Sequence, residues 1–188
     1  MFARTGAKVL LIDVDLRRPR CHKIFEMDNH FGLTNILTGN NGRHEVIRAT
    51  SVEGLHLLSS GAMPPNPAEL IGSTRMRDLL TELGTQYDFL VLDSPPVMAL
   101  TDSVILSTMV DGVVVVVDGT RTPKQIVRTA CARLNYARAK VFGVVLNKVD
   151  ARRSQYGYYY QPYSHYTNGS MAEAVEDEPS VPVSDLEG

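Results

Sequence analysis

Short, unbroken runs of apolar residues recur along the chain, and each run ends in polar or turn-forming residues. Such runs are typical of strands buried on both faces of a parallel sheet. Amphipathic stretches lie between them, and this alternation, in units of roughly twenty to thirty residues, predicts a parallel sheet with covering helices. The expected strands are 9–12, 55–59, 89–92, 112–117 and 141–146, with a further edge strand at 45–49.

The clearest amphipathic stretch is Thr74–Leu83, whose apolar residues recur at helical spacing. Pro67 is suited to the first turn of a helix, because a backbone N–H has no helical partner there. Asp102 is expected in the first turn of a helix at 101–109, where the helix dipole favours a carboxylate by about 0.3–1 kcal/mol. Five consecutive valines predict that the strand at 112–117 is the most buried of the chain. The remaining helical segments are expected at 1–6, 24–25, 32–38 and 123–137.

Two of the apolar runs end in acidic residues. Asp13 and Asp15 follow the first run, and Asp93 follows the run at 89–92, where a Ser-Pro-Pro sequence stops the strand. Because the carboxyl ends of parallel strands meet at one edge of the sheet, we expect these carboxylates to share a site. A hydrated Mg²⁺ suits such a site. One aspartate alone would be better explained as the cap of a turn, but two strands with the same ending favour a site.

The sequence VLLIDVDLR at 9–17 resembles the second Walker motif of the bacterial tyrosine kinases of capsular and exopolysaccharide export, in which apolar residues precede D-x-D-x-R. The sequence LVLDSPP at 90–96 resembles their Walker B motif. Either motif alone also resembles the wider family of deviant P-loop ATPases that position division sites and partition DNA, but the pair favours the kinases. The resemblance covers about residues 1–166 and implies a three-layer α/β/α fold of the P-loop NTPase type.

The same resemblance implies roles for individual residues. Asp13 would orient or deprotonate an incoming tyrosine hydroxyl and lie near the metal. Asp15 and Asp93 would hold Mg²⁺, mostly through water. Arg17 would neutralise phosphate charge or anchor the acidic turn. Asn147, which follows the last strand, is a candidate contact to the adenine ring, although capping of its loop explains it as well.

The phosphate-binding loop of that family, G-x-x-x-x-G-K-[ST], is absent from the sequence, in which no glycine is followed by lysine. A truncated N-terminus, a start assigned too late and true loss of the loop are three explanations, and truncation is favoured because the downstream pattern is intact. ATP and Mg²⁺ are expected only together with the missing segment. In the family's strand order, the missing strand lies between those at 89–92 and 112–117, so its loss would expose apolar strand edges.

The composition changes after Arg153. Residues 151–166 hold six of the eight tyrosines, and the resemblance implies that these are autophosphorylation sites. A stacking surface for RNA or sugar and a low-complexity segment without a specific role are the alternatives, but RNA binding favours interleaved basic residues. Residues 167–188 carry six acidic residues and no Lys or Arg, and we expect disorder there, after an α/β domain at 1–150. The tail tyrosines are Tyr156, Tyr158, Tyr159, Tyr160, Tyr163 and Tyr166.

Composition narrows the remaining choices. The 188 residues are 44% hydrophobic and 21% charged, with a net charge of -2, which fits one globular α/β domain and indicates no general nucleic-acid binding. No apolar run is long enough to cross a bilayer, and no signal-peptide pattern opens the chain. Cys21 and Cys131 lack metal-ligand spacing and are expected to be free thiols in a reducing cytoplasm.

Three functions are therefore considered: a protein tyrosine kinase that regulates polysaccharide synthesis and export, a partitioning-type switch ATPase, and a non-catalytic remnant that serves as a phosphorylation substrate or binding module. The tyrosine-rich tail favours the kinase. The resemblance implies a membrane activator of the chain-length-determinant type, a ring-like homo-oligomer, a cognate tyrosine phosphatase, and a place at the cytoplasmic face of the membrane through the membrane partner.

Overall fold

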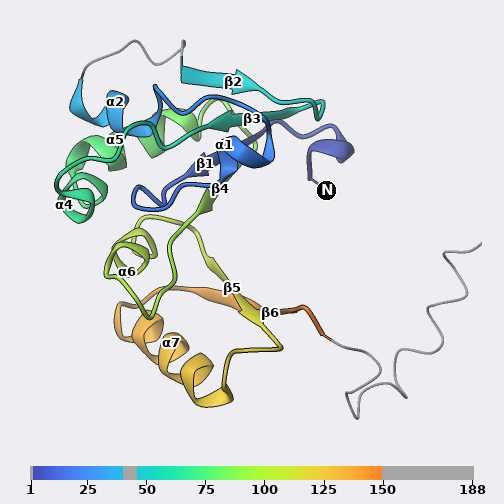
Figure 1. Cartoon of the computed structure of the whole chain (residues 1–188), viewed down its shortest axis with the longest axis vertical. Helices are drawn as coiled ribbons and strands as arrows, with labels where there is room; N and C mark the ends of the chain where they lie inside the picture. The colour runs from blue at the N-terminus through green and yellow to red at the C-terminus, as the bar shows by residue number, and fades with distance from the viewer. Residues whose placement is uncertain (1, 40–45, 150–188) are drawn as a thin grey trace, which may run out of the picture. The chain divides into compact units, whose positions relative to one another are not determined.

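The computed structural model describes residues 2–39 and 46–149, and its helices and strands lie in the compact unit Met1–Asn147 (Figure 1). Most of the larger sheet consists of three parallel strands, β1 (Val9–Asp13), β3 (Leu55–Leu58) and β4 (Phe89–Asp93). The short strand β2 (Ile47–Ala49) is antiparallel to β3, so the strand order is β2-β3-β1-β4. This arrangement confirms the predicted α/β class and the edge position of β2.

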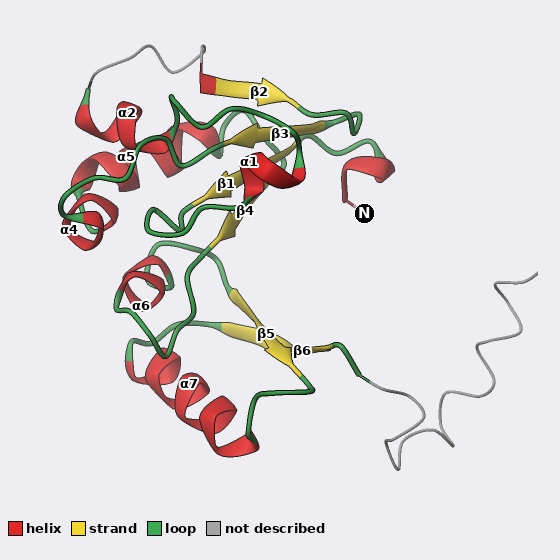
Figure 2. Cartoon of the chain, in the orientation of Figure 1, coloured by secondary structure: helices red, strands yellow, loops and turns green. Residues whose placement is uncertain are grey.

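The other two strands form a separate sheet. They are β5 (Val113–Asp118) and β6 (Val141–Asn147), which pair in parallel with each other. Helices alternate with the strands along the chain, as the sequence predicts (Figure 2). The helices are the 3₁₀ turn η1 (Phe2–Thr5), α1 (Cys21–Ile24), α2 (Leu33–Thr38), α4 (Pro67–Ile71), α5 (Thr74–Leu83), α6 (Asp102–Leu106) and α7 (Lys124–Tyr136).

An apolar core joins the larger sheet to α2, α4 and α5. On β1, Leu10 and Ile12 point to the same face and are fully buried, which stabilises the fold by roughly 1.5–3 kcal/mol for each side chain. The apolar faces predicted for the segments at 32–38 and 74–83 are confirmed, because their side chains enter this core. They are Leu33, Ile36 and Leu37 from α2, and Met76, Leu79, Leu80 and Leu83 from α5.

A smaller core lies between α7 and one face of the β5–β6 pair. Val115 and Val117 alternate on β5 and pack with Leu134 of α7. The opposite face of β5 is not covered, since Val116 is 66% exposed. Both faces of the second sheet are apolar, and one of them is exposed because the single helix covers only the other.

The structure confirms that the sheet is interrupted between β4 and β5. Among the described residues, β4 pairs with β1 alone and β5 pairs with β6 alone. The predictions that the strands at 89–92 and 112–117 are buried, and that the latter is the most buried strand, are therefore wrong. An apolar strand is buried only where neighbouring strands and helices cover it, and Val91 and Val116 lack such cover.

Some predictions concern residues outside the described ranges, namely most of the turn at 39–42, the tyrosine tail at 151–166 and the acidic end at 167–188. Both cysteines are free, as predicted. In the part of the chain that the structure describes, every helix is too short or too polar to cross a lipid bilayer.

Candidate functional site

Asp13 and Asp93 end neighbouring parallel strands and lie directly opposite each other. The register between β1 and β4 pairs Val9 with Phe89 and continues in step as far as Asp13 and Asp93. The N–H of Val14 then donates to the Asp93 carbonyl at 2.9 Å, so the two strand ends stay joined beyond the carboxylates. This register places both acidic side chains at the same edge of the sheet.

The Asp13 carboxylate is fully buried and is held by three backbone N–H groups. Its Oδ1 accepts from Asp15 at 3.2 Å, and its Oδ2 accepts from Arg20 and Cys21, each at 3.0 Å. Burial raises the pKa of Asp13; the Asp93 carboxylate adds to the rise, and the backbone hydrogen bonds oppose it. A cation between the two carboxylates would offset both the desolvation and the repulsion.

Cys21, the first residue of α1, completes a cluster that no sequence motif had predicted. Its thiol donates to Asp93 Oδ2 at 3.3 Å, and its backbone N–H donates to Asp13. One potential ligand atom from each of these three residues lies within 4.8 Å of the other two. Burial, followed by the negative charges of Asp13 and Asp93, raises the pKa of Cys21 far above its usual value. The thiol is therefore protonated, and Cys21 links the two carboxylates through its thiol to Asp93 and its backbone N–H to Asp13.

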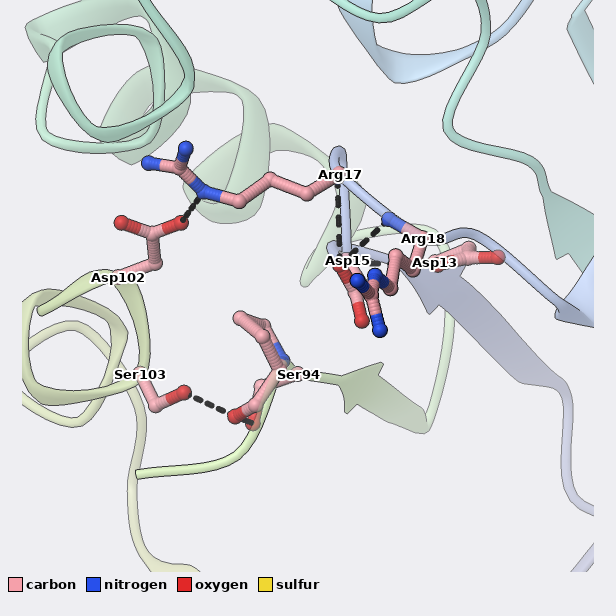
Figure 3. A network of polar contacts seen from close by, with 8 residues as sticks. Asp13, Asp15, Arg17, Arg18, Ser94, Asp102 and Ser103 are labelled. Atoms are coloured by element: carbon pink, nitrogen blue, oxygen red, sulfur yellow. Dashed lines mark hydrogen bonds and ion pairs between the residues drawn. The ribbon is translucent and has the colours of Figure 1, made fainter. Parts of the chain in front are cut away.

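The carboxylates of Asp13 and Asp93 are suitable ligands for the Mg²⁺ that the sequence predicts, because Mg²⁺ prefers carboxylate oxygens. Asp15 lies in the turn that follows β1, where its Oδ1 accepts from the N–H groups of Arg17 at 3.2 Å and Arg18 at 2.9 Å (Figure 3). Asp15 thus shapes the turn, and its role as a metal ligand stays a prediction.

Arg17 extends from this turn to α6, where its Nε lies 3.2 Å from Asp102 Oδ2 (Figure 3). The Asp102 side chain is 1% exposed, and its Oδ1 has no hydrogen-bond partner. Asp102 does occupy the first turn of α6, as predicted. The interpretation that the helix dipole alone explains it is wrong, because a buried carboxylate also needs a paired charge, and Arg17 supplies it.

The start of α6 is also joined to the segment that follows β4. The Ser103 hydroxyl donates to the carbonyl of Pro95, the residue that follows Ser94 in the sequence; Figure 3 labels Ser94 and Ser103. Through Arg17 and Ser103, α6 therefore contacts the segments that follow both acidic strands.

The remaining predicted site residues lie elsewhere. Asn147 ends β6 in the smaller sheet, opposite Asp118, and its contact with adenine stays a prediction. The six tail tyrosines lie outside the described residues. The described site therefore consists of Asp13, Cys21 and Asp93, with Asp15, Arg17 and Asp102 around it.

A family model and the sequences of known proteins both match this chain. The family model described as "AAA domain" matches residues 1–133. The tyrosine-protein kinase YwqD of Bacillus subtilis is 39% identical over 160 residues, which are 85% of this chain and 68% of that protein.

Two solved structures extend the comparison. The kinase domain of the Escherichia coli tyrosine kinase ETK is 33% identical, with a TM-score of 0.78, and the match covers 81% of this chain and 60% of that one. The septum site-determining protein MinD from Pyrococcus horikoshii, complexed with Mg-ADP, has a TM-score of 0.65 at 20% identity, over 82% of this chain and 62% of that one. At that identity the MinD match shows the fold alone, which is of the P-loop NTPase type.

Proposed function

Because this chain belongs to the family of bacterial tyrosine-protein kinases of capsule and exopolysaccharide synthesis, we propose that its acidic sheet edge organises Mg²⁺ and nucleotide phosphates for transfer to tyrosine. The observation that carries the proposal is the register that sets Asp13 opposite Asp93 on adjacent parallel strands. Phosphoryl transfer depends mainly on positioning and on neutralisation of charge, and this edge provides two convergent carboxylates for a cation.

The residues take distinct roles in this proposal. Asp13 and Asp93 would hold Mg²⁺, which, when bound, neutralises charge on the phosphates. Asp13 would also orient the tyrosine hydroxyl and accept or share its proton. Arg17 keeps α6 attached to the turn after β1 through Asp102. Asp15 fixes that turn through backbone hydrogen bonds, which support its proposed role beside the metal.

The proposed phosphate acceptors are the six tyrosines of residues 151–166, on a neighbouring copy of the chain. Each phosphate adds about -1.5 to -2 charge at neutral pH, so a modified tail would be repelled by an acidic site and by other tails. Phosphorylation should therefore loosen a ring-like homo-oligomer. The proposal includes action at the inner face of the membrane beside a membrane activator of the chain-length-determinant type, and reversal by a cognate tyrosine phosphatase.

A switch ATPase without kinase activity is less well supported. Its structural relatives such as MinD are 20% identical to this chain, whereas the ETK kinase domain is 33% identical. A tyrosine cluster also has no evident use in a switch ATPase. A non-catalytic phosphorylation substrate would need neither Asp13 nor Asp93, yet these carboxylates converge.

The test of the acidic edge uses an extended form in which a segment carrying the phosphate-binding motif precedes Met1. Asp13→Ala and Asp93→Ala should each reduce phosphoryl transfer by at least a hundredfold, about 2.7 kcal/mol. The matched control is Asp78→Ala, which removes an exposed acid on α5 and should leave transfer unchanged. Full activity of either site variant would show that the two strands do not share a catalytic site.

A mixing experiment tests the tail. An active extended chain with all six tail tyrosines replaced by Phe is combined with an Asp13→Ala chain that keeps them. Phosphate should appear on the inactive chain, and the oligomer should shrink in light scattering. If ATP is hydrolysed while the tail stays unmodified, the switch ATPase replaces the kinase as the proposed function.

A further inference from the structure

Cys21 gives the acidic cluster a donor that a magnesium site does not use. Mg²⁺ takes oxygen ligands, whereas thiolate favours Zn²⁺ and softer cations. The Cys21 thiol is directed at Asp93 Oδ2 at 3.3 Å, and the residue is 3% exposed. The other cysteine, Cys131, lies on α7 and packs against the smaller apolar core. Among the described residues, Cys21 and not Cys131 belongs to a group of three potential metal ligands.

The distances are close to those of a zinc site with three protein ligands. From Zn–S and Zn–O bond lengths, neighbouring ligand atoms around tetrahedral zinc lie about 3.4–3.6 Å apart. The Cys21 Sγ–Asp93 Oδ2 pair is at 3.3 Å, and all three ligand atoms lie within 4.8 Å of one another. Asp13 is fixed by three backbone hydrogen bonds, whereas Asp93 is exposed and its side chain has room to turn toward a shared cation.

We infer that Asp13, Cys21 and Asp93 form a binding site for a thiophilic divalent cation such as Zn²⁺, and that this cation competes with Mg²⁺ for the two carboxylates. Metal binding itself depends only on the observed cluster, whereas the competition rests on the function proposed above. Water would complete the coordination, because zinc sites with three protein ligands keep a fourth position open.

The two cations leave the site in different protonation states. With Mg²⁺ on the carboxylates, the Cys21 thiol keeps its proton and donates to Asp93. When Zn²⁺ binds, a Zn–S bond forms, the S–H bond breaks, and the proton leaves to solvent with no change of oxidation state. In the zinc-loaded chain, the Cys21 sulfur would be one of the metal ligands. The site would then not provide the octahedral set of oxygen ligands that Mg²⁺ requires. Zinc should therefore inhibit any magnesium-dependent activity of this edge.

The experiment titrates the 188-residue chain with Co²⁺, a coloured substitute for Zn²⁺, in the absence of nucleotide. The unmodified chain and Cys131→Ser should both develop thiolate-to-cobalt charge-transfer absorption in the near ultraviolet, and equimolar Zn²⁺ should remove it. Cys21→Ser should not develop it. Serine is close in size to cysteine, and far-UV circular dichroism checks that the variant is folded. Absorption that persists in Cys21→Ser, or none in the unmodified chain, would overturn the inference.

A second variant separates a three-ligand site from a lone thiol. Asp93→Asn keeps Cys21 and changes an exposed residue, so it should stay folded while the affinity for Zn²⁺ falls at least tenfold. Unchanged affinity would overturn the inference. In a third arm, carried out on the extended form with nucleotide present, millimolar Mg²⁺ should weaken the thiolate-to-cobalt absorption. If it does not, the competition and the proposed magnesium role fail, whereas the thiolate signal and its loss in Cys21→Ser still establish the zinc site.

Discussion

Replacing the partly exposed Arg17 should destabilise the fold more than replacing its buried partner Asp102. Among the described residues, the hydrogen bond to the Asp102 carboxylate comes from Arg17 Nε, at 3.2 Å, and the other carboxylate oxygen has no partner. Arg17→Met removes the charge but keeps an apolar stem, so Asp102 stays buried and unpaired. Asp102→Ala removes the buried charge itself and leaves Arg17, whose side chain is 39% exposed, to water.

The magnitudes follow from burial. Loss of one partner from a fully buried ion pair costs about 3–5 kcal/mol, and because water screens Arg17, we expect about 2–3 kcal/mol for Arg17→Met. Asp102→Ala loses a charge-assisted hydrogen bond and a helix-dipole interaction but leaves no unpaired charge inside, so about 1–1.5 kcal/mol is expected. The double variant should cost about as much as Asp102→Ala, which gives a coupling energy of about 2–3 kcal/mol.

The assay is urea unfolding of the unmodified chain, the two single variants and the double variant, monitored by circular dichroism. The protein concentration is kept where light scattering shows monomers. In thermal unfolding of the same proteins, each kcal/mol lowers the melting temperature of a chain of this size by about 2–4 °C, so Arg17→Met should melt about 4–12 °C below the unmodified chain. A smaller cost for Arg17→Met than for Asp102→Ala, or a coupling energy within about 0.5 kcal/mol of zero, would refute the reasoning.

Three further predictions concern the backbone, the pH dependence and the open sheet. Gly32→Ala should cost about 2–4 kcal/mol in urea unfolding, because a Cβ there would lie 2.1 Å from the Ser59 carbonyl oxygen, whereas Gly143→Ala, with no atom within 4 Å, should cost none. Burial raises the pKa of Asp13 above 3.8, so the folded chain binds this proton more tightly than the unfolded chain. The free energy of unfolding of the unmodified chain, relative to that of Asp13→Asn, should therefore fall as the pH rises through and above 3.8. A difference in unfolding free energy that stays constant from about pH 3 to 7 would contradict this. Val116→Lys should reduce self-association in light scattering, since Val116 is 66% exposed on the uncovered face of β5, and undiminished scattering would argue against association through this face.

Local pattern determined the elements and much of their packing. The helix Thr74–Leu83 and the inward faces of α2 and α5 follow from apolar spacing, because periodicity fixes which side chains share a face. The positions of Asp13 and Asp93 at strand ends also follow, since parallel strands joined by right-handed crossovers bring their carboxyl ends to one edge. The role of the six tail tyrosines as phosphorylation sites rests on the sequence alone and stays a prediction.

Only the tertiary structure decided which groups meet and which surfaces are covered. Arg17 and Asp102 are 85 residues apart in sequence, and Cys21 is directed at Asp93 from the start of α1, with no recognisable metal spacing. The valine run of β5 predicts a buried strand, yet alternate valines are exposed. No described strand pairs with the free edge of β5, and α7 covers only one face of the sheet. The spacing of apolar residues determines which face of a segment can be buried. Whether that face is buried, and which charges pair, depends on the strands and helices that the chain topology places beside it.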